Sequence, residues 1–243
     1  MVKNSKYIIL FIVFCFGCLT SLVGQSKHLQ IEYSLNLKLL NDVSSSTELV
    51  NTIIKNIKPY QDRLSYVLKL DENQSTFYGK SFLESDLNPQ VASQLKLHSG
   101  FDEVYYQSSQ DNYFIIQFTS RAFSGIVIKN KKIDFDWQIS KSNQKIILGY
   151  KCFYAETSFE IGRDKYYIEA WFTPEINANL GPKNLRGLPG VILVFEENNK
   201  KYFEAKEISE SKQSRVKIPE FKSTMTYNEF TNFLIKNYGV NED

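Results

Sequence analysis

Alternation of apolar and polar residues over short segments is the feature that most restricts the fold of this chain. In the segment 28–40, for example, Ile31, Tyr33, Leu35 and Leu37 alternate with polar residues. Successive side chains on a strand point to opposite faces, so a period of two predicts strands. Strands that follow one another through short turns pair antiparallel. The further segments predicted as strands are 63–70, 75–82, 103–108, 113–119, 125–129, 137–140, 145–160, 165–173, 191–195 and 202–208.

Three segments, 45–57, 89–100 and 226–238, have helical spacing instead. Each begins with residues that cap helix N-termini, either a capping box or an Asn-Pro pair. We therefore expect a few short helices among the strands. The capping pairs are Ser45 with Glu48, Asn88 with Pro89 and Thr226 with Glu229, and the apolar face predicted for the first helix consists of Leu49, Ile53 and Ile57.

The run from Val191 to Phe195 is apolar throughout, which is typical of a strand that is covered on both faces. An antiparallel sheet alone can leave one face in water. A fully buried strand therefore requires a sheet that wraps onto itself or is covered by helices. The expected fold is mainly β with a few helices (α+β), a strongly curved antiparallel sheet or half-barrel whose open side is closed by the short helices.

The first residues are typical of a secretory signal peptide. Lys3 and Lys6 precede an apolar segment at 8–16, and Gly24 is a small residue at the exit. The alternative is a membrane anchor, but the apolar stretch is slightly shorter than the ~18–20 residues that span a bilayer. A lipid anchor at Cys18 lacks the residues that usually precede one. We expect export, with a final location in the periplasm, at the outer-membrane surface or in the medium.

Cleavage after Gly24 divides the chain into a signal peptide, 1–24, and a single domain, 25–243. Two of the 29 basic residues lie in the leader, which leaves 27 basic and 27 acidic residues. A neutral chain without basic blocks is not expected to bind nucleic acid. Only Cys152 remains after cleavage, so no internal disulfide is expected, and no membrane-spanning segment is expected either.

The segment 181–190 concentrates residues with special backbone conformations directly before the apolar run. Pro fixes φ, and Gly permits a positive φ or a close approach of backbones, so this is a shaped loop that sets the direction of the next strand. Pro189 and Gly190 suit the centre of a type II turn. Leu188 either protrudes as an apolar knob or is tucked inward as a plug. Five of the 17 Gly and Pro residues lie here, namely Gly181, Pro182, Gly187, Pro189 and Gly190.

These residues also carry a resemblance to a known family. The six residues from Gly187 to Ile192 read GLPGVI, and residues 149–196 around them resemble the GLPGLI family of exported Bacteroidetes proteins, with Val191 in place of Leu. The resemblance implies export to the periplasm or cell surface. It implies no reaction, because the family has no established activity. The flanking matches are Gly149 to Cys152, Ala155, Gly162-Arg163, Ala170 to Ile176, and Gly181-Pro182.

No pattern in the sequence indicates a metal, a cofactor or a nucleophile. His28 and His98 are the only histidines, and no His/Cys spacing matches a zinc site. A Gly-x-Ser-x-Gly elbow is absent. Cys152 lies on an alternating strand and is interpreted as a small buried residue, the alternatives being a reactive thiol or an attachment point.

Acidic residues that are adjacent in sequence are interpreted as solvated turn charge, because neighbours on a strand face opposite ways. This applies to Asp134 with Asp136 and to Glu196 with Glu197. An enzyme would require carboxylates that converge on one cleft together with Arg163 or Arg186. We predict no catalytic residue.

The candidate binding residues lie in the loop 181–190, called the motif loop below, at the strand end that precedes it, and in an aromatic rim beside it. Glu175 lies where a strand ends, and it either braces the loop or faces a ligand. The aromatic residues near it either pack in the core or line a cavity wall. The predicted set is Gly187, Leu188, Pro189, Gly190, Trp171, Phe172 and Glu175.

Together these features predict a non-catalytic binding module for a hydrophobic ligand, such as an acyl chain or a lipidated peptide, or for a segment of an envelope protein. The layout loosely resembles the half-barrel lipoprotein carriers of the bacterial envelope, at the level of fold only. The alternative is a structural or assembly partner with a filled interior and an exposed apolar patch near Leu188. An enzyme is the third possibility.

Overall fold

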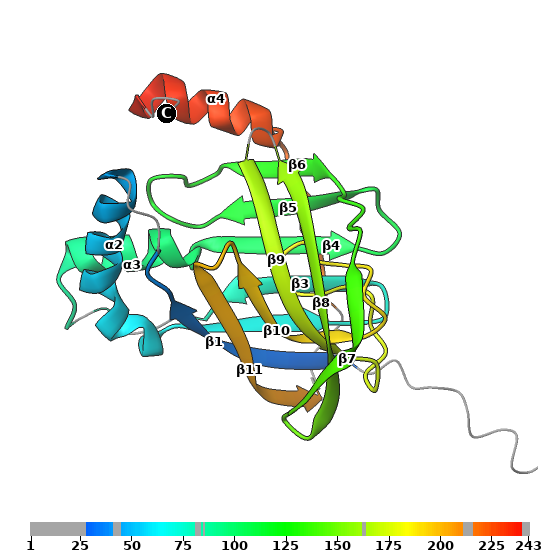
Figure 1. Cartoon of the computed structure of the whole chain (residues 1–243). Coiled ribbons are helices and arrows are strands. Elements are labelled where there is room, and N and C mark those ends of the chain that lie inside the picture. The colour runs from blue at the N-terminus through cyan, green and yellow to red at the C-terminus, as the bar shows by residue number, and fades with distance from the viewer. Residues whose placement is uncertain are drawn as a thin grey trace, which may run out of the picture.

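A computed structural model of the chain describes residues 28–40, 45–80, 84, 86–161, 164–210 and 216–239. The predicted signal peptide lies outside the described residues, as do Gly162, Arg163 and the side chain of Ser45. The described part is mainly β, as the alternation predicts, with an eleven-stranded antiparallel sheet and three α-helices (Figure 1). None of the helices in this part is long and apolar enough to cross a membrane.

The elements follow the predicted segments closely. The helices are α2 (Ser45–Ile57), α3 (Pro89–Ser99) and α4 (Tyr227–Tyr238), with a 3-10 helix η1 (Lys58–Arg63) after α2. The strands are β1 (Leu29–Leu37), β2 (Ser65–Leu70), β3 (Gln74–Gly79), β4 (Glu103–Ser108), β5 (Tyr113–Phe118), β6 (Val127–Lys131), β7 (Gln138–Ile147), β8 (Tyr150–Ile161), β9 (Asp164–Thr173), β10 (Val191–Glu197) and β11 (Lys201–Glu210).

The order of strands in the sheet is β6-β5-β4-β3-β2-β1-β11-β10-β9-β8-β7. All neighbours are consecutive in sequence except β1 and β11, which join two meanders into one open sheet. The edge strands β6 and β7 are themselves consecutive, with six residues between them. In a flat sheet these edges would lie roughly 48 Å apart, whereas a link of this length spans at most about 25 Å. The sheet must therefore fold back, and Figure 1 shows β8 and β9 passing across β3 to β6.

Aromatic side chains fill the space between the two halves of the sheet, the first formed by β1 to β6 and the second by β7 to β11. Phe195 and Phe203 stack at 4.4 Å between ring centroids, and Phe77 of the other half lies 6.2 Å and 6.1 Å from them. The hydroxyl of Tyr33 donates to the carbonyl oxygen of Ile192 at 2.6 Å. Every residue from Val191 to Phe195 is buried, which confirms that β10 is covered on both faces.

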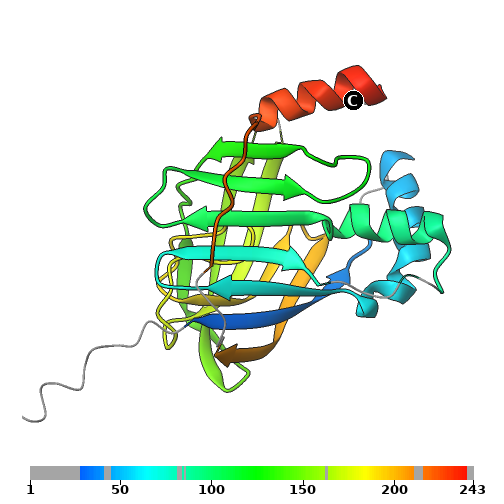
Figure 2. The same ribbon diagram turned by 180° about the vertical axis from the view of Figure 1, so that it is seen from behind.

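The described helices lie at an end and an edge of the sheet. Helices α2 and α3 pack together beside the ends of β1 to β4, and α4 lies next to β6 (Figures 1 and 2). The segment 216–226 before α4 crosses the outer face of the first half (Figure 2) and bonds to β6 through Met225 and Lys129. No described helix lies over the outer face of β8 and β9 in Figure 1. This arrangement does not confirm the predicted half-barrel closed by helices.

Two predictions about the bounds of a strand and the face of a helix are wrong. The segment 145–160 is not one strand, because a turn at Leu148 (φ 50°) and Gly149 (φ 86°) separates β7 from β8. Alternation continues through the turn, so periodicity alone does not locate it. In α2, Leu49 is 65% exposed, while Ile54 is buried with Ile57. The apolar face of α2 is therefore shifted, because the face is set by the side of the helix that meets α3 and η1.

Candidate binding pocket

The two glycines of the motif loop meet different requirements. A Cβ on Gly190 (φ +149°) would lie 2.0 Å from the carbonyl oxygen of Thr173 and 2.8 Å from the Cα of Pro174. Gly187 (φ +89°) has no such contact, since its nearest neighbour would be Trp137 at 3.9 Å. Gly190 is thus required by the close approach of two backbone segments. Gly187 is favoured only by its backbone conformation.

The turn that precedes β10 is not the predicted type II turn. The Gly190 N–H donates to the carbonyl oxygen of Leu188 at 2.9 Å, which closes a three-residue turn centred on Pro189. In a type II turn the bond would join the Leu188 carbonyl to the Val191 N–H. That N–H instead donates to the carbonyl oxygen of Ile176 at 3.2 Å. Pairing with the segment after β9 therefore replaces the local turn bond.

The predicted aromatic rim and the motif loop do not border an open pocket. Leu188 is 2% exposed, so it is a plug in the core and supplies no exposed apolar patch. Phe172 is also buried and faces Phe153 at 6.2 Å between centroids. Trp171 is half-buried, and the Lys145 ammonium lies 4.2 Å from its ring centroid. Leu188, Phe172 and Trp171 are absent from the linings of the three most prominent pockets of the described residues.

Side chains that the sequence analysis missed hold the loop in place. The Gln107 amide on β4 donates to the carbonyl oxygens of Gly181 at 2.8 Å and Lys183 at 3.0 Å. The Trp137 indole donates to the carbonyl oxygen of Arg186 at 2.8 Å. Gln107 and Trp137 are far from the loop in sequence, so no local pattern indicates these bonds.

Lys183 anchors the same loop from inside the protein. It has a positive φ of 55°, and its side chain is buried. Its ammonium donates to Glu197 at 2.6 Å and lies near the rings of Tyr105 and Phe203. A buried cation needs such a partner, because an unpaired charge is costly away from water. The loop is therefore rigidly tied to the core of the sheet.

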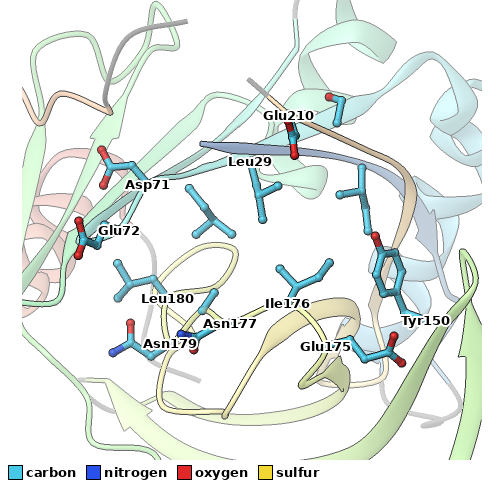
Figure 3. A pocket seen from close by; sticks show the side chains of 14 residues that line it. Leu29, Asp71, Glu72, Tyr150, Glu175, Ile176, Asn177, Asn179, Leu180 and Glu210 are labelled. Carbon is cyan, nitrogen blue, oxygen red and sulfur yellow. The ribbon is translucent and has the colours of Figure 1, made fainter. Parts of the chain in front are cut away.

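An open pocket of about 760 Å³ lies on the other side of this loop, where several strands end (Figure 3). Four parts of the chain build it: the start of β1 with the end of β11, the end of β2 with its turn, the start of β8, and the segment after β9. Its volume is in the range of small-ligand sites. The lining residues are Leu29, Leu70, Asp71, Glu72, Tyr150, Glu175 to Leu180, and Ile208 to Glu210.

The lining combines apolar side chains with acidic ones. Figure 3 shows the side chains around a common space, with Asp71 and Glu72 on one side and Tyr150 and Glu175 on the other. No Lys, Arg or His is among the described residues that line it. The apolar members are Leu29, Leu70, Ile176, Ala178, Leu180 and Ile208, and the acidic members are Asp71, Glu72, Glu175 and Glu210.

Glu175 is the one member of the predicted site that reaches this pocket. Its carboxylate accepts a hydrogen bond from the Lys151 N–H at 2.8 Å, and its own N–H donates to the Thr173 hydroxyl at 3.3 Å. Bracing and ligand contact are the two roles that the sequence allows for Glu175. The contacts show the bracing role, and the residue also lies in the pocket lining.

Asp71 is fixed even more firmly. One carboxylate oxygen accepts from the N–H groups of Asn73 at 3.1 Å and Gln74 at 2.8 Å. The other accepts from the Val216 N–H at 3.0 Å. This carboxylate thus braces the β2–β3 turn and the segment before α4.

The condition for an enzyme is met only in part. Carboxylates converge on one pocket, but Arg186 lies elsewhere and donates to the Ser108 carbonyl oxygen at 3.4 Å. Across the described residues, no group of three or more His, Cys, Asp or Glu side chains is placed to hold a metal ion. Cys152 is buried, and burial raises the pKa of its thiol to about 11. A thiol of this kind is a poor nucleophile near neutral pH.

Comparison with known proteins gives limited information. Residues 158–194, from the end of β8 to β10, match the model of a family described as a protein of unknown function (Porph_ging). No curated protein matches the chain. Two solved structures of PNGF-II, in the C2 and P21 space groups, are similar over 87% of this chain, each with a TM-score of 0.49 and with 14% and 11% sequence identity. The chain spans about a third of their length (33% and 34%), and a likeness of this size supports no functional argument.

Proposed function

We propose that this chain is an exported, non-catalytic binding module of the GLPGLI type, and that it holds its ligand in the pocket where β1 begins and β2 and β11 end. The observation that carries the proposal is the construction of the pocket. Apolar side chains from separate strands, such as Leu29, Leu70 and Ile208, meet there around an open space of about 760 Å³. A preformed concavity that combines apolar surface with polar groups is a common form of a small-molecule binding site, and this pocket has both kinds of lining residue.

The motif loop supports this proposal by holding the pocket in shape rather than by touching a ligand. The segment after β9 supplies six of the lining residues, Glu175 to Leu180, and the loop follows it directly. Gln107 and Lys183 fasten the loop to the core. A wall fixed in this way needs little ordering when a ligand binds, which favours affinity.

The predicted half-barrel and the envelope location belong to the same proposal. The short link between the edge strands β6 and β7 supports a strongly bent sheet. In a half-barrel the ends of the strands form the entrance, and the pocket lies at such an end. The leader-like segment at residues 1–24 and the GLPGVI motif support export.

The test is binding of a neutral, hydrophobic fluorescent probe, Nile red, to the purified protein. We expect probe fluorescence to rise on binding and the affinity to fall about tenfold in Ile176→Asn, because an apolar wall residue of the pocket becomes polar. Ile139→Asn on the exposed strand β7 is the matched control and should bind as the unmodified protein does.

Circular dichroism of both variants checks that they are folded. If the probe does not bind the unmodified protein, or if both variants lose affinity equally, the pocket is not the binding site and the proposal is wrong.

A further inference from the structure

We propose that the edge strand β7 binds an extended segment of another polypeptide in which apolar residues alternate with Asp or Glu. The segment would join the sheet as a further strand next to β7. This inference goes beyond the proposed function, because the surface lies outside the pocket and no β7 residue lines it. Binding of Nile red therefore neither supports nor contradicts it.

The two edges of the sheet differ in the described part of the chain. The edge at β6 is covered by the segment before α4, since the Met225 N–H donates to the carbonyl oxygen of Val127 at 2.9 Å and the Lys129 N–H donates to that of Met225 at 2.9 Å. β7 pairs with β8, and no other described strand lies beside it. Every second residue of an antiparallel strand directs its N–H and C=O away from its partner. Such an edge is a template for another strand.

The regular part of this edge is the stretch 144–147. Residues 141–143 before it form a bulge that has no counterpart on β8. The bulge bonds to itself, as the Asn143 N–H donates to the Ser140 hydroxyl at 3.3 Å. In the stretch 144–147 each residue pairs with one residue of β8. A partner strand can therefore run along 144–147.

The two faces of this stretch favour different partner residues. Ile146 and Lys145 are neighbours on the strand, so their side chains point to opposite faces. Ile146 is 68% exposed, and Leu148 after it is 44% exposed. With Ile139 they are three of the eight exposed large apolar residues of the described part, so apolar surface is concentrated at this edge. A partner strand gains most from apolar side chains beside Ile146 and from carboxylates beside Lys145.

The charge of β7 favours an acidic partner. The strand contains Lys141 and Lys145 and no acidic residue. Neither lysine belongs to an ion pair of the described residues. The Lys145 ammonium lies 4.2 Å from the ring centroid of Trp171, and partial burial lowers its pKa. A carboxylate on the next strand would lie beside this cation and attract it.

The same features disfavour a second copy of the chain as the partner. Lysines and a bulge are devices that keep edge strands from pairing with each other. Two β7 strands side by side would bring the lysines of both copies together, and like charges that face each other across strands are destabilising. An acidic strand meets no such repulsion. The edge therefore selects its partner by charge.

The experiment measures binding of labelled peptides to the purified protein by fluorescence anisotropy. The three peptides are acetyl-Thr-Val-Glu-Ile-Glu-Val-Thr-amide, the same peptide with Lys in place of Glu, and the same peptide with Ser in place of Glu. We expect the Glu peptide to bind at least about tenfold more tightly than the Lys peptide, with the Ser peptide between them. Its affinity should fall severalfold between about 0.05 M and about 0.5 M salt, because salt screens exposed charges.

Methylation of peptide nitrogens tests the strand pairing itself. One version of the Glu peptide is N-methylated at both Glu residues, and another at both Val residues. The N–H groups of these two sets point to opposite edges of the added strand. At least one version should therefore bind about tenfold or more weakly, because it lacks the hydrogen bonds to β7.

Substitution of the two lysines locates the site. Lys141→Gln with Lys145→Gln should weaken binding of the Glu peptide about three- to tenfold. The matched control, Lys217→Gln with Lys222→Gln, makes the same change of net charge at exposed positions in the segment before α4 and should change affinity less than about twofold. Circular dichroism checks that both pairs of variants are folded.

Distinct results would overturn each part of the inference. Equal affinity for the Glu and Lys peptides would contradict the acidic partner and would admit a second copy. Unchanged binding of both methylated peptides, or no binding of the Glu peptide, would contradict strand addition. Equal weakening by the lysine pair and the control pair would show that the overall charge of the protein attracts the peptide, which would contradict a site at β7.

Discussion

Replacing each motif glycine, Gly190 and Gly187, by Ala distinguishes two reasons for a glycine. One is close contact with another backbone segment, and the other is a positive φ. In Gly190→Ala the new methyl group would lie 2.0 Å and 2.6 Å from the carbonyl oxygen and carbon of Thr173. Both atoms belong to the backbone of β9, so no side-chain rotation relieves the overlap. Overpacking costs about 1–3 kcal/mol, and a non-Gly residue in an unfavourable backbone region adds about 1–3 kcal/mol. We expect a loss of about 3 kcal/mol or more.

Gly187→Ala is the matched control. Its methyl group would meet no atom within 3.9 Å, so only the positive φ of 89° opposes it. We expect a loss of about 1 kcal/mol. Urea unfolding followed by tryptophan fluorescence measures both. With a slope of about 2 kcal/mol per M, the midpoint of Gly190→Ala should lie roughly 1 M below that of Gly187→Ala. Equal midpoints would refute the claim that the glycines differ in function.

Two further predictions concern the loop and the free thiol. Gln107→Leu leaves the buried carbonyls of Gly181 and Lys183 without their donor and should lower the free energy of unfolding by about 1–3 kcal/mol in the same urea assay; an unchanged midpoint would contradict the bracing role. Because burial raises the pKa of Cys152 to about 11, its thiolate fraction should stay below about 1% up to pH 9, and a thiol reagent should react far more slowly with the native than with the denatured protein. The folded pKa exceeds the unfolded value of about 8.5, so the contribution of Cys152 to stability is complete below pH ~8.5 and is lost as the pH rises towards about 11. A Cys152→Ala variant, which lacks this titration, should show a smaller loss of stability over that range; identical pH profiles would contradict it.

Local signals predicted much of the fold. The capping box of α4 is present, since the Thr226 hydroxyl accepts from the Glu229 N–H at 3.2 Å and the Glu229 carboxylate accepts from the Thr226 N–H at 2.7 Å. Asn88 caps α3 with a single bond, since its side-chain oxygen accepts from the Gln90 N–H at 2.9 Å, and Gly100 ends that helix with φ 69°. Caps and alternation depend on neighbours within a few residues, so they can be read from the chain.

The pocket could not be predicted in this way. It exists because β1 pairs with β11, which places Leu29 opposite Glu210. No pattern near either residue specifies a partner so far along the chain. Glu175 was the exception, because its place at the end of a strand was visible in the sequence. The Gly and Pro residues predict the rigid motif loop, but they do not decide whether Leu188 protrudes or is tucked inward. Leu188 packs inward because the folded-back sheet offers it a core.

The proposal that the pocket is the binding site is tested most directly by hydrogen exchange of backbone amides with and without Nile red. The account predicts that protection rises in the lining segment 175–180 and at the ends of β2 and β11, with little change at Gly187 to Gly190. Protection confined to the motif loop, or no change at the ends of these strands while the probe is bound, would contradict it.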